Sequence, residues 1–241
     1  MNAKVEVETL FWRLAPPAAG VLLIILFVSL GFWQLDRAAE KVAMQRLFDA
    51  DADYTPLSEG MSVQDYQRLS TSGRFLDDRQ FLIDNMILNS RVGYFVITPF
   101  EYASDAPLLL VNRGWLAAAP DRSLPSLVPL PPADLEIRGR AGHLPRVGIR
   151  SRDAVSPGSG WPKLATYPEL SELSRALGRD VLPFVLLLDP HDGDALIRQW
   201  QPQGRGPAMH YGYAFQWFAM AAAVAAILAW QFLKRRGHER P

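Results

Sequence analysis

Hydrophobic residues are concentrated near the two ends of this chain. Residues 14–35 contain no charged side chain, and neither do residues 211–233. Because a helix rises about 1.5 Å per residue, each stretch is long enough to cross a hydrocarbon core of about 30 Å. Tryptophans lie near the ends of both stretches, where a membrane interface favours them. The pattern therefore predicts two transmembrane helices, residues 14–35 and residues 210–233.

The charges beside these stretches predict how the chain crosses the membrane. Residues 234–241 form a basic tail, and Lys and Arg collect on the cytoplasmic side of a span. Two spans put both termini on one side, so residues 1–13 are expected in the cytoplasm and residues 36–209 outside it. Basic residues just after the first span oppose this orientation. A cleaved signal peptide is the alternative for the first span, but no small-residue cleavage site follows it.

The segment between the spans changes its pattern along its length. Residues 36–49 contain no Gly or Pro, so the first helix is expected to continue to about Asp49. From Tyr66 onward, short apolar runs alternate with turn residues, which is typical of strands in an antiparallel sheet or small barrel. The expected strands are residues 67–75, 80–84, 93–100, 107–112, 135–141 and 182–189.

One further helix and a long loop are expected in the same segment. Residues 166–180 fit a helix with Pro168 in its first turn and Gly178 at its end. Residues 117–132 hold five prolines and are expected to form a loop. The predicted fold class is a membrane α+β protein, in which two transmembrane helices flank an extracytoplasmic, mainly antiparallel β domain with one or two helices.

Composition excludes several classes of function. The 25 basic and 25 acidic residues balance, which argues against nucleic acid as a partner. The absence of cysteine excludes disulfides, thiolate metal sites and cysteine nucleophiles. No zinc-protease, nucleophile-elbow, phosphate-loop or dinucleotide motif occurs, so the chain is predicted not to be an enzyme. Residues 189–194 look like a cation loop, but they lack the EF-hand spacing and favour a plain turn.

His210 stands out because it begins the second apolar stretch. A neutral imidazole at the edge of a membrane has a nitrogen lone pair that can ligate iron. The alternative is an interfacial histidine that bonds to water or lipid headgroups. Gln34 ends the first span at the same interface, and small residues on both spans allow close approach. The two spans are therefore expected to pack against each other. The small residues meant are Gly31, Gly212, Ala214 and residues 221–223.

Three blocks of the sequence resemble the surfeit locus protein one family. They are "LGFWQLDRAAEK" from Leu30, "VGYFVITPF" with "LLLVNRGWLAAAPDR" from Leu108, and "HYGYAFQWFAMA" from His210. The blocks occur in the order and with the spacing of that family. The resemblance implies a two-span, multi-pass protein of the bacterial inner membrane with its main domain in the periplasm.

The resemblance also implies an activity. It points to an assembly factor for cytochrome c oxidase that binds haem a and assists its insertion into the catalytic subunit. The implied partners are that subunit, other assembly factors and membrane lipid. His210 matches the position of the proposed iron ligand, and Arg37 and Arg205 are candidate partners for the haem propionates. A haem-free scaffold that stabilises an oxidase subunit is the alternative.

Three more residues complete the candidate cofactor-binding set. Gln34 is included for its position beside His210. Arg113 and Trp115 are expected at a strand end that feeds a turn at Gly114. One interpretation is that they form a platform that faces haem or a partner protein. The other is that Arg113 forms a buried ion pair and Trp115 is a core residue.

Overall fold

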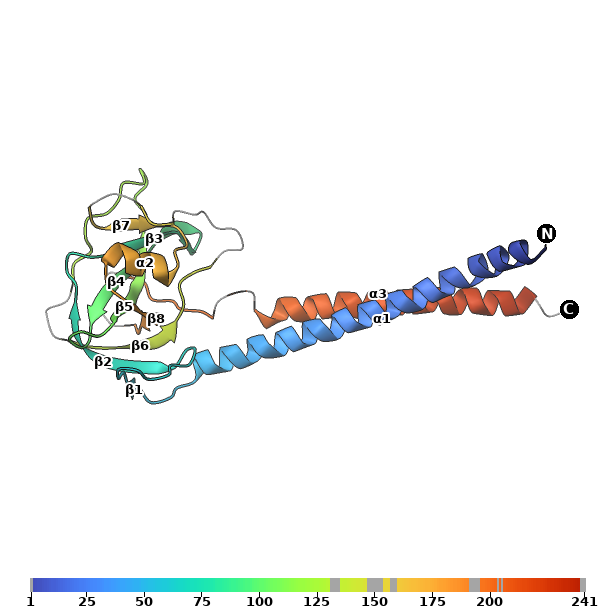
Figure 1. Cartoon of the computed structure of the whole chain (residues 1–241), viewed down its shortest axis with the longest axis horizontal. Coiled ribbons are helices and arrows are strands. Elements are labelled where there is room, and N and C mark those ends of the chain that lie inside the picture. The colour runs from blue at the N-terminus through green and yellow to red at the C-terminus, as the bar shows by residue number, and fades with distance from the viewer. Residues whose placement is uncertain are drawn as a thin grey trace. The chain divides into compact units, whose positions relative to one another are not determined.

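The computed structural model describes two compact units. It describes residues 2–130, 135–146, 154–156, 160–190, 196–202, 204 and 206–238. One unit, called here the helix pair, comprises Met1–Arg46 and Gly204–Pro241. The other, called the β unit, comprises Leu47–Gln203. Two membrane-type helices at the ends of the chain thus flank a β-rich domain, which confirms the predicted fold class (Figure 1).

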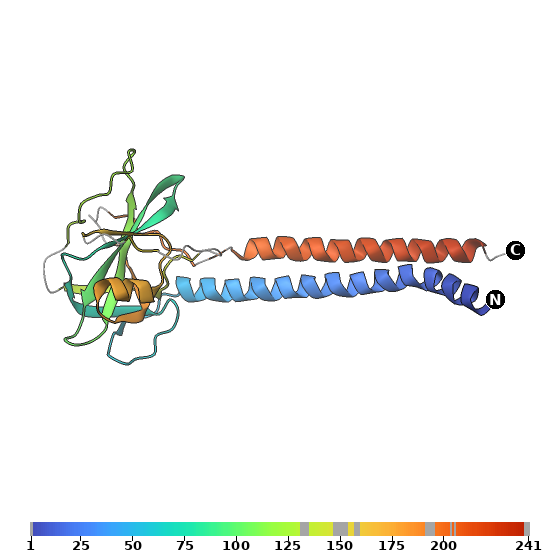
Figure 2. The ribbon, with the colours of Figure 1, turned by 45° about the horizontal axis from the view of Figure 1, so that its top comes forward.

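The helix pair consists of α1 (Asn2–Asp49) and α3 (Pro207–His238). Their parts Ala15–Asp49 and Pro207–Lys234 are long and apolar enough to cross a membrane. The predicted continuation of the first helix to Asp49 is confirmed. Figure 2 shows a bend in the dark blue part of α1, the part that contains Pro16 and Pro17. Proline lacks the N–H that would bond to the preceding turn, which is a common cause of such bends.

Both helices have buried or half-buried residues at alternating intervals of three and four. This spacing places a single seam along each helix, as in left-handed coiled coils. The seam of α1 consists of Gly20, Ile24, Phe27, Gly31, Gln34, Ala38 and Lys41. The seam of α3 consists of Pro207, His210, Ala214, Trp217, Ala221, Val224 and Leu228.

Side-chain contacts show that the two seams meet in antiparallel orientation. A Cβ atom placed on Gly20 would lie 2.8 Å from Leu228, and one on Gly31 would lie 2.6 Å from the ring of Phe218. The rings of Phe27 and Trp217 are 5.6 Å apart. The predicted packing of the two helices is therefore confirmed. The glycines act chiefly as hollows that receive large side chains of α3.

The β unit is built around a closed sheet. Its order is β1-β2-β6-β8-β5-β4-β3-β7, and an additional pairing of β2 with β4 closes β2, β6, β8, β5 and β4 into a small barrel. Most pairs are antiparallel, whereas β1–β2, β3–β7 and β5–β8 are parallel. The strands are β1 (Thr55–Pro56), β2 (Arg68–Phe75), β3 (Phe81–Leu88), β4 (Arg91–Glu101), β5 (Leu108–Ala117), β6 (Leu135–Gly142), β7 (Lys163–Ala165) and β8 (Val181–Leu188).

The core of the β unit lies on both faces of β5. Leu109 and Val111 pack with Phe100 on one side, and Leu110 packs with Leu173 on the other. Leu173 belongs to α2 (Leu170–Leu177), whose apolar side covers that face. A strand covered on both sides needs an uninterrupted apolar run, which the sequence "LLLV" provides.

Several sequence expectations needed correction. The strand expected at residues 107–112 continues to Ala117, and Gly114 lies inside it with φ +137° instead of forming a turn. The strands β1 and β7 were not expected. Helix α2 begins after Glu169, so Pro168 precedes its first turn, whereas Gly178 ends it as expected. Residues 118–130 contain no helix or strand, and the rest of the expected loop lies partly outside the described residues.

Candidate functional site

A polar pair interrupts the apolar seam of the helix pair. The Nδ1 atom of His210 lies 2.8 Å from the Oε1 atom of Gln34. Gln34 is 9% exposed and His210 is half-buried. An amide oxygen can only accept a hydrogen bond, so Nδ1 carries the proton and donates it. In the neutral ring, Nε2 is then left with a free lone pair.

The sequence brings these two residues together through the small side chains around them. Ala38 lies one turn beyond Gln34 and is 0% exposed, and Ala214 lies one turn beyond His210 and is 2% exposed. Small alanine side chains at these seam positions leave room for the longer side chains of Gln34 and His210 to meet. Phe218 fills the hollow at Gly31, on the same side of the pair as Ala214 and opposite to Ala38. The polar pair is thus held between packed layers.

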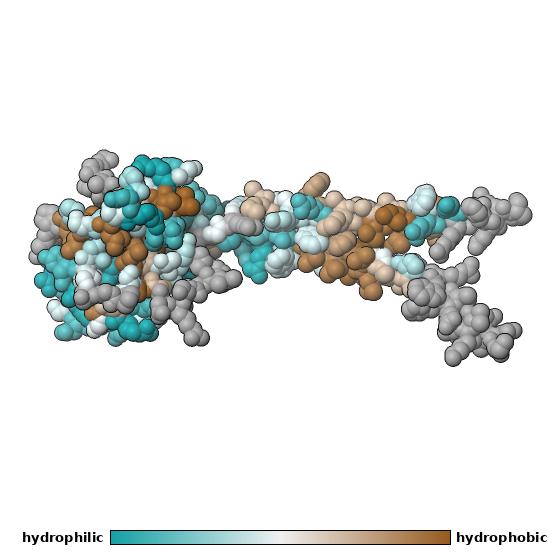
Figure 3. All heavy atoms as spheres, turned by 90° about the horizontal axis from the view of Figure 1, so that it is seen from above, coloured by the Kyte–Doolittle hydropathy of each residue, from teal (hydrophilic) through white to brown (hydrophobic). Residues whose placement is uncertain are grey.

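Large aromatic side chains are exposed on the same part of both helices. Phe32 and Trp33 on α1 are 58% and 49% exposed, and Tyr211 and Phe215 on α3 are 50% and 74% exposed. On the face in Figure 3, a hydrophobic stretch lies along the middle of the helix pair, and hydrophilic residues are more frequent on either side of it. The polar pair therefore has apolar surface available beside it.

Arg37 and Arg205 were predicted to supply positive charge near His210. Arg37 lies one turn beyond Gln34, bonds to Glu40 at 2.7 Å, and holds its guanidinium 5.7 Å from the ring of Trp33. Arg205 lies outside the described residues. Lys41 is a further cation of the helix pair, beyond the two arginines that were expected. A Cβ placed on Gly204 would lie 3.2 Å from its Nζ atom, and its place on the α1 seam was the signal that could have found it.

Arg113 is buried in the β unit and bonds to no carboxylate among the described residues. It is 5% exposed, and its guanidinium donates to the carbonyl oxygens of Pro129 (2.7 Å) and Val128 (3.4 Å). None of its bonds to described residues involves an acid, so the expected ion pair is not found there. Burial lowers the pKa of Arg113 to about 10. Through these two hydrogen bonds, Arg113 anchors the loop of residues 118–130 to β5.

Trp115 lies in the core of the β unit. It is 4% exposed, and its Nε1–H donates to the carbonyl oxygen of Met86 at 2.8 Å. These are the surroundings that the core-tryptophan alternative describes. Among the described residues, no three His, Cys, Asp or Glu side chains are grouped to hold a metal ion. Most of the loop at residues 189–194, including His191, lies outside the described residues.

Comparison with known proteins gives a consistent result. A model described as the SURF1 family matches residues 21–222. A SURF1-like protein of Monosiga brevicollis is 27% identical over 88% of this chain and 85% of its own length. A SURF1-like protein of Rickettsia bellii is 27% identical over 86% of each chain. The cytochrome oxidase assembly protein SHY1 of Saccharomyces cerevisiae is 25% identical over 70% of this chain and 45% of its own length.

Proposed function

This chain belongs to the SURF1 family, and we propose that it is a membrane-anchored assembly factor for cytochrome c oxidase that binds haem a through His210. The name of the yeast relative, a cytochrome oxidase assembly protein, supports the assembly role. The observation that carries the haem part is the hydrogen bond between Nδ1 of His210 and Oε1 of Gln34.

That hydrogen bond prepares the imidazole for iron. It directs the proton to Nδ1, and so leaves the Nε2 lone pair as the ligand atom. Histidine ligands in proteins commonly donate their second N–H to an oxygen, which fixes the tautomer and the ring orientation. Gln34 would have this positioning role. A glutamine oxygen carries no full negative charge. It therefore orients the ring, but it stabilises the iron-bound imidazole less than a carboxylate would.

The surroundings of His210 suit the other parts of haem a. Its ring and long apolar tail would lie against the exposed aromatic side chains, which include Trp33 and Tyr211. Arg37 and Arg205 would pair with the propionates, and Arg37 would exchange its surface bond to Glu40 for this contact. An exposed ion pair of this kind contributes little, about 0.2–1 kcal/mol, so the exchange costs little.

The function requires holding and release instead of catalysis. One protein ligand on a site open to one side favours finite affinity, which is what transfer to the oxidase catalytic subunit needs. In the proposed arrangement, both candidate spans cross the bacterial inner membrane, the basic tail is cytoplasmic, and the β unit is periplasmic. Compartment-sensitive reporters at both termini and in the β unit would test this orientation.

The test is the absorption spectrum of protein purified from cells that synthesise haem a. Wild type is expected to carry haem a, and His210→Ala is expected to lose about tenfold or more of it, because the ligand atom is removed. His143→Ala in the β unit is the matched control and should keep the wild-type haem content. A colourless wild type would favour the haem-free scaffold, and full haem content in His210→Ala would show that His210 is not the ligand. If Arg37→Ala and Arg205→Ala both keep normal haem content, the propionate assignment is wrong.

A further inference from the structure

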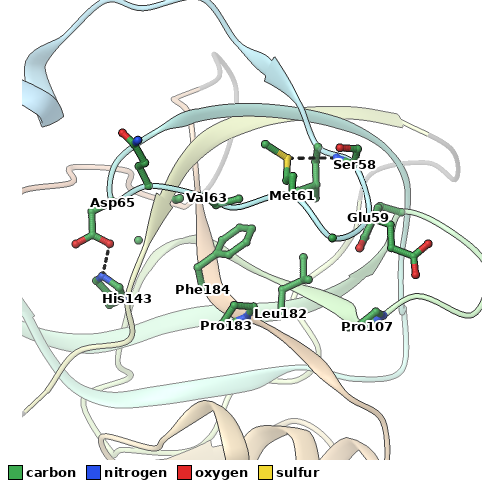
Figure 4. Close-up of a pocket in the computed structure, with 16 residues that line it drawn as sticks. Ser58, Glu59, Met61, Val63, Asp65, Pro107, His143, Leu182, Pro183 and Phe184 are labelled. Carbon is green, nitrogen blue, oxygen red and sulfur yellow. Dashed lines mark hydrogen bonds and ion pairs between the residues drawn. The ribbon is translucent and has the colours of Figure 1, made fainter.

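The β unit has a pocket that is separate in sequence and structure from the His210 site. It has a volume of about 530 Å³ and lies between residues 57–65 and the strands β6 and β8 (Figure 4). Pockets for small molecules have volumes of this order, about 300–1,000 Å³, so an apolar side chain and its neighbours fit in it.

The middle of the pocket is apolar. Phe184 and Leu182 of β8 form one wall, and Met61 and Val63 face them (Figure 4). These side chains pack against the barrel core, in which Phe184 is 7% exposed. The backbone N–H of Ser58 bonds to the sulfur of Met61 at 3.4 Å. Methionine adapts its shape to different apolar partners, so this wall can accommodate an inserted side chain.

The two ends of the pocket are acidic. Glu59 lies at one end, and Asp65 lies at the other, where its Oδ1 atom is 2.8 Å from Nε2 of His143 (Figure 4). Among the described residues that line the pocket, none is Lys or Arg. The pocket therefore offers an apolar centre between two carboxylates, which is complementary to an apolar group flanked by positive charges.

Two residues that line the pocket carry polar groups without a hydrogen-bond partner among the described residues. The hydroxyl of Tyr102, which lines it, is buried and has no hydrogen-bond partner among the described residues. Burial, and then the charge of Glu59, raises the pKa of Tyr102, so the hydroxyl stays protonated and can donate. Val63 also lines the pocket, and its backbone makes no hydrogen bond to described residues. Free main-chain groups in an extended segment are what a bound peptide uses.

We infer that this pocket binds an extended peptide segment of a partner protein, with an apolar side chain in the pocket and Lys or Arg beside it. The apolar side chain would occupy the space between Phe184 and Met61. The basic residues would pair with Glu59 and Asp65, and the peptide backbone would bond to the main chain of Val63. This inference does not depend on haem binding at His210.

The test compares two peptides on the full chain in detergent by fluorescence anisotropy. The first is labelled Gly-Ser-Arg-Leu-Leu-Arg-Ser-Gly, and the second has Glu in place of both Arg. The arginine peptide is expected to bind about tenfold or more tightly than the glutamate peptide, because like charges oppose the second. Glu59→Gln should weaken the arginine peptide about three- to fivefold, as expected for one partly exposed charge pair. Asp77→Asn, an exposed acid elsewhere on the β unit, is the matched control.

Two further variants separate this site from the haem site and from misfolding. Tyr102→Phe keeps the ring and its packing, and should weaken binding a few-fold if the hydroxyl donates to the peptide. His210→Ala should leave peptide binding unchanged while it removes haem. Equal binding of both peptides, no binding of either, or equal loss in Glu59→Gln and Asp77→Asn would overturn the inference.

Discussion

Two buried glutamines, one in each unit, use their amides in different ways. Gln80 in the β unit is 0% exposed, and its amide donates to the carbonyl oxygen of Val128 (2.7 Å) and accepts from the N–H of Val128 (2.8 Å). Gln34 in the helix pair instead bonds to a side chain, that of His210. The first arrangement is closed, since both ends are satisfied by the backbone. The second leaves a ring nitrogen available for a ligand.

The same contrast extends to the charged residues. Arg113 in the β unit is satisfied by the carbonyl oxygens of Val128 and Pro129, next to the bonds of Gln80. Together these two side chains hold a loop that has no helix or strand of its own. Buried polar groups that bond to backbone are therefore best understood as structural. A buried polar pair with one free acceptor is the better candidate for function.

The largest expected effect on stability comes from breaking the closed arrangement. Gln80→Ala should lower the free energy of unfolding of the β unit by about 2 kcal/mol, because Val128 loses two hydrogen bonds and a small cavity forms. Urea unfolding followed by tryptophan fluorescence measures this. Gln199→Ala, an exposed glutamine of the same unit, should change stability by less than about 0.5 kcal/mol. If the two variants are equally stable, Gln80 does not hold the loop.

The next effect should appear in haem binding with little change in stability. Gln34→Leu removes the acceptor of the His210 N–H, so haem a affinity should fall about tenfold, as for other outer-shell partners of metal ligands. Helix-pair stability should change by only about 0.6 kcal/mol, the usual value of one hydrogen bond between membrane helices. Haem titration and thermal unfolding measure the two quantities.

Gln216→Leu is the matched control for that variant. Gln216 is an exposed glutamine on α3, and its replacement should leave haem affinity unchanged. Equal affinity of Gln34→Leu and wild type would mean that the bond does not prepare the imidazole. A large loss of stability would instead make Gln34 structural, like Gln80.

The smallest effect concerns the response of the β unit to acid. Glu101 bonds to Arg179 at 2.8 Å and to Arg74 at 2.7 Å, and these contacts, Arg179 first, hold its pKa below the ordinary value. Its contribution to stability is complete above the unfolded-state pKa and is lost as the pH falls through the lower folded-state pKa. Glu101→Gln should therefore flatten the loss of stability in acid, by less than about 1 kcal/mol. Parallel pH profiles of wild type and variant would contradict this role.

Much of the fold could be predicted from local pattern. The strands β2, β4, β6 and β8 follow apolar runs between turn residues, and α1 continues to Asp49 because nothing in its sequence breaks it. The strands β1 and β7 are too short for any periodicity, and they exist because β2 and β3 pair with them. Gly114 indicated a turn, but its positive φ is accommodated inside β5, beside an irregularity in the β4–β5 register.

The candidate site was partly predictable for a similar reason. Small residues predicted that the two helices pack, and the shared interface brought Gln34 and His210 under consideration together. Their direct bond depends on the register between segments far apart in the chain, which no local pattern specifies. The partners of Arg113 were also hidden, because they are backbone carbonyls of an irregular loop.

The seven-residue repeat of the two seams has a consequence for alignment. Sliding α3 along α1 by one repeat would again bring mostly apolar side chains together. Hydrophobic packing alone therefore distinguishes the two alignments poorly. Such a slide would set Gln34 against Trp217 and separate it from His210. The polar pair thus identifies the correct alignment, as a lone asparagine does in many coiled coils. Because the bond that sets the alignment uses Nδ1 of His210, a ligand could bind and leave at Nε2 while α1 and α3 keep their register.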